Sequence, residues 1–153
     1  MRGGVKNAFI CMAYLGTSDI RTRLYHRLKE VGFHLPIIVD ETAVVAESAQ
    51  IGEGSYIGRN AVVNGDAQVG KMCIINNGAV LEHDCVLGDF SHLSVGAVAC
   101  GVVKIGEETF VGANATILQC LTVGNKVKVG AGAIVLGDVP DYCTACGVWK
   151  NLK

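Results

Sequence analysis

Proline, aromatic side chains and excess charge of either sign are all scarce in this sequence. The chain has 153 residues, with 2 prolines, 6% aromatic residues and a formal net charge of −1 at pH 7. Nucleic-acid-binding surfaces carry a basic excess, so we expect no nucleic-acid partner. No apolar run is long enough to cross a bilayer, and the N-terminus lacks the apolar stretch of a signal peptide. We therefore expect neither a membrane span nor secretion.

The abundant residues are β-branched residues and glycine. The sequence holds 21 Val, 11 Ile and 20 Gly, all poor helix formers, which excludes an all-helical bundle. Half of the residues are hydrophobic and 18% are charged, which excludes disorder over most of the chain. The 7 cysteines are odd in number and irregularly spaced. This favours reduced thiols in a cytoplasmic protein over a disulfide framework.

Aliphatic residues recur every six positions from Val39 to Val135 without a change of register. Of these 17 positions, 16 are Val, Ile or Leu, and the exception is Ala99. The following residue is often glycine, and the residue four positions after each aliphatic is mostly small. Neither a helix nor an ordinary strand has this period. Each hexapeptide is therefore one side of a triangular coil of 18 residues, with aliphatic and small side chains inside and glycine used for its freedom in φ at the turn.

This pattern predicts an all-β protein, a left-handed parallel β-helix over residues 37–140, followed by a C-terminal tail over 141–153. Residues 1–36 predict a short N-terminal βα unit, which begins with a buried strand over residues 8–13. A helix follows, with Thr17 or Ser18 as its N-cap and Gly32 at its end. This unit is too small to be a domain alone, so we expect it to cap the first coil.

The expected helix carries an apolar stripe that we predict to face the protein, with its basic side chains mostly on the other surfaces. The stripe consists of Ile20, Leu24, Leu28 and Val31. The helix start around Gly16 could bind an anion through its free N–H groups, although plain capping explains the same residues.

One turn of the expected β-helix carries an unusual group of polar residues. Glu82-His83-Asp84 places a histidine between two acidic residues, and His92 lies nine positions later. His83 is two residues past the inward-facing Leu81, so it lies in a turn and points outward. A carboxylate bonded to one imidazole nitrogen raises the basicity of the other, which suits a general base near neutral pH. A surface histidine in a polar turn is the alternative interpretation.

Stacking of the coils adds a second observation at His83. Residues 18 positions apart lie above one another, which places Gly65 below His83 and Gly101 above it. A glycine over the candidate base would leave room for a ligand and a free backbone N–H. Such an N–H can stabilise the oxyanion of an acyl transfer.

Other chemistries are weaker interpretations of the same residues. Cys100 stacks on Glu82, which does not activate a thiolate, so we do not expect a cysteine nucleophile. A catalytic zinc needs three protein ligands, and the repeat region offers only two histidines, so we expect no metal. Cys143 and Cys146 form a lone C-x-x-C pair, for which free cysteines are the simpler interpretation.

The stretch from Ile75 to Ala97, with Glu82-His83-Asp84 and Ser91-His92 inside it, resembles bacterial sugar acetyltransferases. These are the hexapeptide-repeat sialic acid O-acetyltransferases and UDP-4-amino-sugar N-acetyltransferases. The likeness extends from about Ala8 to Val139 and includes the N-terminal helix.

This resemblance implies a homotrimer that binds acetyl-CoA in the groove between two prisms. It implies that His83 is the general base, tuned by Asp84 with Glu82 beside it, and that the acetyl group passes directly to a sugar or sugar-nucleotide acceptor. The other implied roles cover cofactor binding (His92, Gly101, Gly112, Ala113, Gly130 and Ala131) and acceptor binding (Asn76, Asn77 and Gly16). Residues 1–36 would correspond to the last part of the family's nucleotide-sugar-binding domain.

The sequence therefore predicts an acetyl-CoA-dependent N-acetyltransferase that acts on an amino group of a sugar or sugar nucleotide. Two alternatives stay open. One is an O-acetyltransferase acting on a sugar or small hydroxylated metabolite, and the other is a catalytically silent trimeric binding module.

Overall fold

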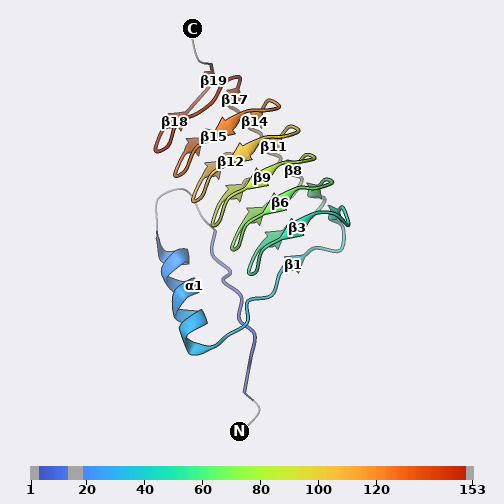
Figure 1. Ribbon diagram of the computed structural model, residues 1–153, viewed down its shortest axis with the longest axis vertical. Coiled ribbons are helices and arrows are strands. Elements are labelled where there is room, and N and C mark those ends of the chain that lie inside the picture. Colours follow the sequence, from blue (N-terminus) through green and yellow to red (C-terminus); the bar gives the residue numbers. More distant parts are fainter. Residues whose placement is uncertain (1–3, 14–18, 151–153) are drawn as a thin grey trace.

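The computed structural model describes residues 4–13 and 19–150. Figure 1 shows a stack of short strands joined by turns, with one helix beside the N-terminal coils. Strands pair in parallel with the strand one coil later, and the register is 18 residues: Ile57 pairs with Ile75, and Ile75 with Leu93. The predicted parallel β-helix is confirmed.

Every strand has two residues, and the strands form three parallel sheets that are the sides of the prism. Face 1 contains β1 (Ile38–Val39), β4 (Tyr56–Ile57), β7 (Ile74–Ile75), β10 (His92–Leu93), β13 (Phe110–Val111), β16 (Lys128–Val129) and β18 (Thr144–Ala145). Face 2 contains β2 (Val44–Val45), β5 (Val62–Val63), β8 (Val80–Leu81), β11 (Val98–Ala99), β14 (Thr116–Ile117), β17 (Ile134–Val135) and β19 (Val148–Trp149). Face 3 contains β3 (Gln50–Ile51), β6 (Gln68–Val69), β9 (Val86–Leu87), β12 (Lys104–Ile105) and β15 (Thr122–Val123).

The turns between these strands form the three edges of the prism. The chain passes from face 1 to face 2, then to face 3 and back to face 1. We name the edges 1/2, 2/3 and 3/1 after the faces they join. Each edge collects turns that are 18 residues apart in the sequence.

The core is the stack of inward side chains that the six-residue period predicted. From Ile57 to Val135, each residue of this series is at most 5% exposed, and the small residues beside them, such as Ala61 and Cys73, are buried too. Val39 is 46% exposed, because β1 is the edge strand of its sheet among the described residues. Burial of aliphatic surface along this stack stabilises the fold.

The glycines that follow the inward aliphatic residues have a different role from the one that the sequence suggested. None of them has a positive φ; the left-handed position falls two residues later, where Phe90, Asp84 and many other residue types occur. A Cβ on Gly106 would lie 2.7 Å from the backbone nitrogen of Asn125 in the next coil, and one on Gly88 would lie 2.6 Å from that of Glu107. Glycine is required there by the close approach of the coils.

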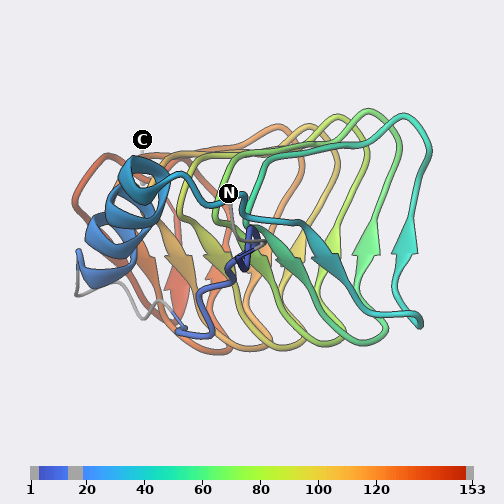
Figure 2. The ribbon, with the colours of Figure 1, turned by 90° about the horizontal axis from the view of Figure 1, so that it is seen from below.

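Helix α1 (Ile20–Val31) packs along edge 3/1 and does not cap the first coil. Figure 2 shows the helix beside the coils. Asp19 occupies the N-cap position without a side-chain cap bond, so the prediction of Thr17 or Ser18 was wrong; both lie outside the described residues. Gly32 ends the helix in the left-handed conformation, as predicted.

The buried face of α1 also differs from the predicted apolar stripe. Of the predicted stripe, Leu28 packs against the protein, but Ile20, Leu24 and Val31 are exposed. Arg21 and Tyr25 are buried instead. Tyr25 packs with Leu35, Met72, Phe90 and Ile10 in a small cluster separate from the main core. The helix is thus oriented by its contacts with edge 3/1 and not by its most apolar side.

Polar contacts complete the attachment of α1. Arg21 donates from Nη2 to the carbonyl of Met72 at 2.6 Å. Tyr25 donates to Glu53 at 2.7 Å, and Lys29 pairs with the same carboxylate at 2.8 Å. These two hydrogen bonds hold the pKa of Glu53 below its ordinary value.

The segment before the helix is not the buried strand that we predicted over residues 8–13. Its regular pairing is one isolated parallel bridge between Asn7 and His34. Ile10 is buried, but Cys11, Met12 and Ala13 are exposed. No helix in the described ranges is long and apolar enough to cross a bilayer.

The predicted tail continues the solenoid up to Trp149. Residue spacing between neighbouring coils shortens here: Lys128 pairs with Thr144, and Ile134 pairs with Val148. A bridge between Val123 and Val139 begins this shortened coil. Trp149 packs against the core, and its indole donates to the carbonyl of Asp138.

Candidate active site

His83 lies on edge 2/3, in the turn between β8 and β9. Buried Leu81 and Cys85 anchor the two ends of this turn. The Asp84 N–H donates to the Gly65 carbonyl below, and the His83 carbonyl accepts from Val102 N–H above. The turn is therefore fixed from both sides, as the stacking of Gly65, His83 and Gly101 predicted.

The imidazole of His83 bonds to the next residue. Its Nδ1 lies 2.9 Å from Asp84 Oδ2, and both side chains are well exposed. This hydrogen bond, with the negative charges of Asp84 and Glu82, raises the pKa of His83 above its ordinary value of 6.5. With the proton of the neutral ring on Nδ1 beside the carboxylate, Nε2 is left as the basic atom.

Gly101 lies directly against this ring. A Cβ on residue 101 would be 2.6 Å from His83 Nε2 and 2.7 Å from Cε1. The space above the turn, which we expected to admit a ligand, is thus occupied by the imidazole itself. The Gly101 N–H donates to no atom within the described residues, whereas side chains accept the corresponding N–H at other turns, such as Lys71 and Glu107. An unpaired donor therefore adjoins the candidate base.

Glu82 makes its hydrogen bonds to groups other than the imidazole. Its carboxylate accepts from Asn64 Nδ2 at 2.8 Å and from the backbone N–H of His83 at 3.3 Å. The sequence analysis missed Asn64, although the 18-residue period places it directly below Glu82. Asn64 and Glu82 together brace the turn that carries His83.

Asn76 and His92 form a second group, on face 1 and edge 1/2. His92 is 2% exposed, packs edge-to-face on Phe110, and has its Nε2 3.3 Å from Asn76 Nδ2. The two side chains are within hydrogen-bond distance, and the direction of the bond follows the tautomer of His92. Asn77 is turned away and caps the backbone N–H of Arg59. The structure brings Asn76 and His92 together, and they are on a different edge from His83.

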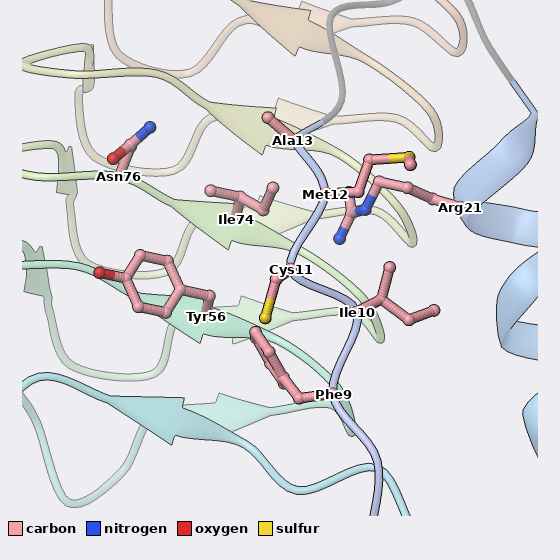
Figure 3. Close-up of a pocket in the computed structure, with 9 residues that line it drawn as sticks. All are labelled: Phe9, Ile10, Cys11, Met12, Ala13, Arg21, Tyr56, Ile74 and Asn76. Carbon is pink, nitrogen blue, oxygen red and sulfur yellow. The ribbon is translucent and has the colours of Figure 1, made fainter.

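A cavity of about 180 Å³ adjoins Asn76. Figure 3 shows the chain segment Phe9–Ala13 crossing in front of the strands that carry Tyr56 and Ile74. Among the described residues of the lining, only Arg21 carries a formal charge. Apart from Asn76, the sequence analysis missed these residues, because the segment has no periodic pattern. This volume is below the ~300 Å³ at which small-molecule pockets begin, so the described residues of one chain enclose only part of such a pocket.

The other predicted cofactor residues lie on edge 1/2, above Asn76. Gly112 needs to be glycine, because a Cβ there would be 2.5 Å from Ala131 N. The 18-residue register between β13 and β16 places Gly130 above Gly112 and Ala131 above Ala113. One chain does not bring them to His83 and Gly101, since face 2 separates the two edges. Gly16 lies outside the described residues.

Cysteine and metal chemistry receive no support from the arrangement of side chains. Cys73 and Cys85 are buried in the core, as predicted, and burial raises the pKa of Cys73 to about 12. Cys143 and Cys146 are free thiols, one partly buried and one exposed. The described residues contain no group of three or more His, Cys, Asp or Glu side chains placed to hold a metal ion.

Comparison with known proteins gives a family match and close structural relatives. A family model described as a hexapeptide repeat of succinyl-transferase matches residues 49–83 and 102–136. PerB from Caulobacter crescentus, solved in complex with CoA and GDP-perosamine, is 35% identical with a TM-score of 0.91; the match covers 98% of this chain and 71% of PerB. A search of curated protein sequences gave no match.

Two further solved structures extend this likeness. The acetyltransferase domain of PglB from Neisseria gonorrhoeae FA1090, in complex with acetyl coenzyme A, is 38% identical with a TM-score of 0.85, over 90% of this chain and 67% of that one. In another structure of the same domain the match covers 64% of the solved chain. WeeI from Acinetobacter baumannii AYE is 26% identical with a TM-score of 0.87, over 95% of this chain and 71% of WeeI. This chain thus spans about two thirds of its relatives' length.

Proposed function

Because this chain belongs to the hexapeptide-repeat acetyltransferases, we propose that it transfers the acetyl group of acetyl-CoA to an amino group of a sugar nucleotide. The observation that carries the proposal is the exposed His83–Asp84 pair with the unpaired Gly101 N–H beside it. Relatives support both substrates, since PerB was solved with CoA and GDP-perosamine and the PglB domain with acetyl coenzyme A.

The proposed reaction is a direct transfer without a covalent enzyme intermediate. The acceptor amine attacks the thioester carbonyl while His83 Nε2 takes a proton from the nitrogen. The Gly101 N–H stabilises the oxyanion. The carbon–sulfur bond then breaks, and the imidazolium returns the proton to the departing CoA sulfur. The products are the acetamido sugar and CoA. In this scheme Asp84 keeps Nε2 basic and Glu82 braces the turn.

The remaining predicted residues define the substrate sites in this proposal. Asn76, at the rim of the cavity, binds the sugar of the acceptor, and His92 fixes the Asn76 amide. The pantetheine and adenine of CoA lie along edge 1/2, near Ala113 and Ala131. Because these residues and His83 are on different edges, the proposal requires a site shared between neighbouring copies, which we take to be those of a homotrimer. Seven free thiols fit a reducing compartment, so we place the protein in the cytoplasm.

To test the proposal, the protein is given acetyl-CoA and a panel of amino-sugar nucleotides, and acetyl transfer is measured as release of CoA. We expect His83→Ala to lower kcat by about 10²- to 10⁴-fold, because a general base is lost. His26→Ala is the matched control, since His26 is an exposed histidine on α1, and it should leave kcat unchanged. A wild-type rate for His83→Ala would refute the role of His83. Transfer to hydroxyl acceptors only would favour the O-acetyltransferase, and no transfer to any acceptor would favour a silent module.

The pH profile gives a second readout. The rate should fall as the pH drops through the raised pKa of His83, because only the neutral ring accepts a proton. Asp84→Asn removes the hydrogen-bonded charge, so the acid limb should move to lower pH while the plateau falls. If the acid limb of the Asp84→Asn pH–rate profile did not move, a group other than His83 would control that limb.

A further inference from the structure

Arg59 is an exposed cation on a part of the surface that otherwise lacks basic side chains. It lies on edge 1/2, in the turn between β4 and β5, and its side chain is 75% exposed. The described turns that join face 1 to face 2 and face 2 to face 3 contain no other Lys or Arg. Their charged residues are otherwise acidic, namely Asp40, Glu41, Glu47, Asp66, Glu82, Asp84 and Asp138. Arg59 is therefore the one described positive charge in the turns that carry the candidate site residues.

The backbone of Arg59 is fixed, whereas its guanidinium is little used within the chain. The 18-residue register places Arg59 below Asn77, whose Oδ1 accepts from the Arg59 N–H at 3.0 Å. Gly78 N donates to the Arg59 carbonyl at 2.7 Å. In the side chain, Nε lies 3.5 Å from Asp40 Oδ2, while Thr42 donates twice to the other oxygen of that carboxylate. The terminal nitrogens of Arg59 have no hydrogen bond to a described residue, so they can bind a ligand.

The proposed positions of the two substrates determine which group reaches Arg59. Asn76, which we propose to bind the sugar, is in the turn directly above. The residues proposed for CoA, Ala113 and Ala131, are on higher coils of the same edge. With CoA above Asn76, the rest of the acceptor extends over the lower coils, toward β1. Coils are about 4.8 Å apart, so the turn of Arg59 is the first that a group attached to the sugar meets.

In a sugar nucleotide, the group attached to the sugar is a negatively charged diphosphate. Arginine binds phosphate through two parallel N–H bonds of its planar guanidinium. The other charged groups near the candidate site are less suitable. Glu82 and Asp84 flank His83 and repel an anion. Arg21 is 3% exposed and already donates to the carbonyl of Met72.

We propose that Arg59 is a specificity-determining residue that binds the diphosphate of the acceptor and thereby selects a sugar nucleotide over a free amino sugar. This inference rests on the proposed function, because it takes Asn76 as the sugar ligand and the higher coils as the CoA site. The hydrogen bond between Arg59 N and Asn77 connects the diphosphate subsite to the turn that carries Asn76. Binding of the nucleotide and placement of the sugar amine are thus linked through one pair of stacked turns.

The first test measures binding without acetyl transfer, by calorimetric titration with GDP and with UDP. Arg59→Ala should raise the Kd of both by about ten- to a hundredfold, because charge-assisted hydrogen bonds to phosphate are lost. Arg59→Lys should have an intermediate Kd, since it keeps the charge but not the planar fork. Arg23→Ala is the matched control, because Arg23 on α1 is also exposed and paired with one acid, and it should bind like the wild type. An unchanged Kd for Arg59→Ala, or no binding of either probe by the wild type, would overturn the inference.

The second test separates the diphosphate from the sugar. With amino-sugar nucleotides, Arg59→Ala should raise the KM of the acceptor by about tenfold or more and leave the KM of acetyl-CoA unchanged. With the corresponding free amino sugar, the wild type and Arg59→Ala should have equal kcat/KM, because this acceptor has no phosphate. An equal loss with both acceptors would mean that Arg59 acts only through the structure of its turn, which contradicts the proposed role.

The proposed function and the role of Arg59 fail in different ways. A wild type that binds GDP or UDP through Arg59 but transfers no acetyl group contradicts only the proposed function. A wild type that acetylates sugar nucleotides with the same KM as Arg59→Ala contradicts only the role of Arg59.

Discussion

The solenoid and the N-terminal unit are held together in different ways. In the solenoid, each coil repeats the same inward stack, and residues such as Ile105 and Ile117 have almost no exposed surface. In the N-terminal unit, α1 is attached by a small apolar cluster and by hydrogen bonds from Arg21 and Tyr25 to a single edge. The stability of the solenoid is therefore distributed over many equivalent positions, whereas the attachment of the helix depends on a few contacts.

The largest expected effect is on the core of the solenoid. Ile105→Ala should lower the free energy of unfolding by about 2–5 kcal/mol, because it leaves a cavity in a closely packed stack. Lys104→Ala, on the same strand but facing outward, should change it by less than about 0.5 kcal/mol. Denaturant unfolding measures both. Equal effects would mean that the inward stack does not dominate stability.

A smaller and local effect is expected on the helix. Arg21→Ala removes the bond to the Met72 carbonyl, so the opening free energy of α1 should fall by about 1.5–3 kcal/mol. Amide hydrogen exchange should show faster exchange in α1 and unchanged exchange in the solenoid. Arg23→Ala breaks only the exposed pair with Asp19 and serves as the control. Faster exchange in both regions after Arg21→Ala would show that they unfold as one unit.

The smallest effect concerns Glu53 and pH. The ionised carboxylate is stabilised in the folded state, since its pKa is below the ordinary value. Its contribution is therefore complete above about pH 4.5 and is lost as the pH falls through the folded-state pKa. Glu53→Gln should weaken α1 attachment by at most about 1 kcal/mol, because water screens this partly exposed pair. It should also flatten the acid dependence of the α1 amide signals in NMR spectra. An unchanged dependence would mean that other groups control it.

The regions also differ in how much of them could be predicted. The six-residue period predicted the parallel pairing, the register and the core, because every coil repeats the same steric constraints. It misassigned the role of the glycines, since the left-handed position accepts residues as large as Phe90 and Val102 and has no compositional signal. The helix was predicted, but only Leu28 of its expected apolar stripe packs against the protein. Burial of Arg21 depends on a carbonyl of Met72, 51 residues away.

The candidate site also contains some contacts that could be predicted from the sequence and others that could not. The contact of His83 with Asp84 and the position of Gly101 follow from sequence adjacency and 18-residue stacking. The same stacking would have found the Asn64–Glu82 bond. The Asn76–His92 contact depends on side-chain direction, and the cavity beside Asn76 depends on the path of residues 9–13. Neither has a periodic signal, so neither could be predicted.

The shortened coil at the C-terminal end has a consequence for growth of the stack. A solenoid of equal coils presents, at each end, open strands that fit another molecule of the same kind, which is a route to fibres. Here the spacing drops at Lys128–Thr144 and again at Ile134–Val148, so β18 and β19 enclose a smaller outline than the coils beneath. A full coil from another molecule would not match that outline on all three sides. An equal coil would therefore pair less completely with β18 and β19 than with the coils beneath them.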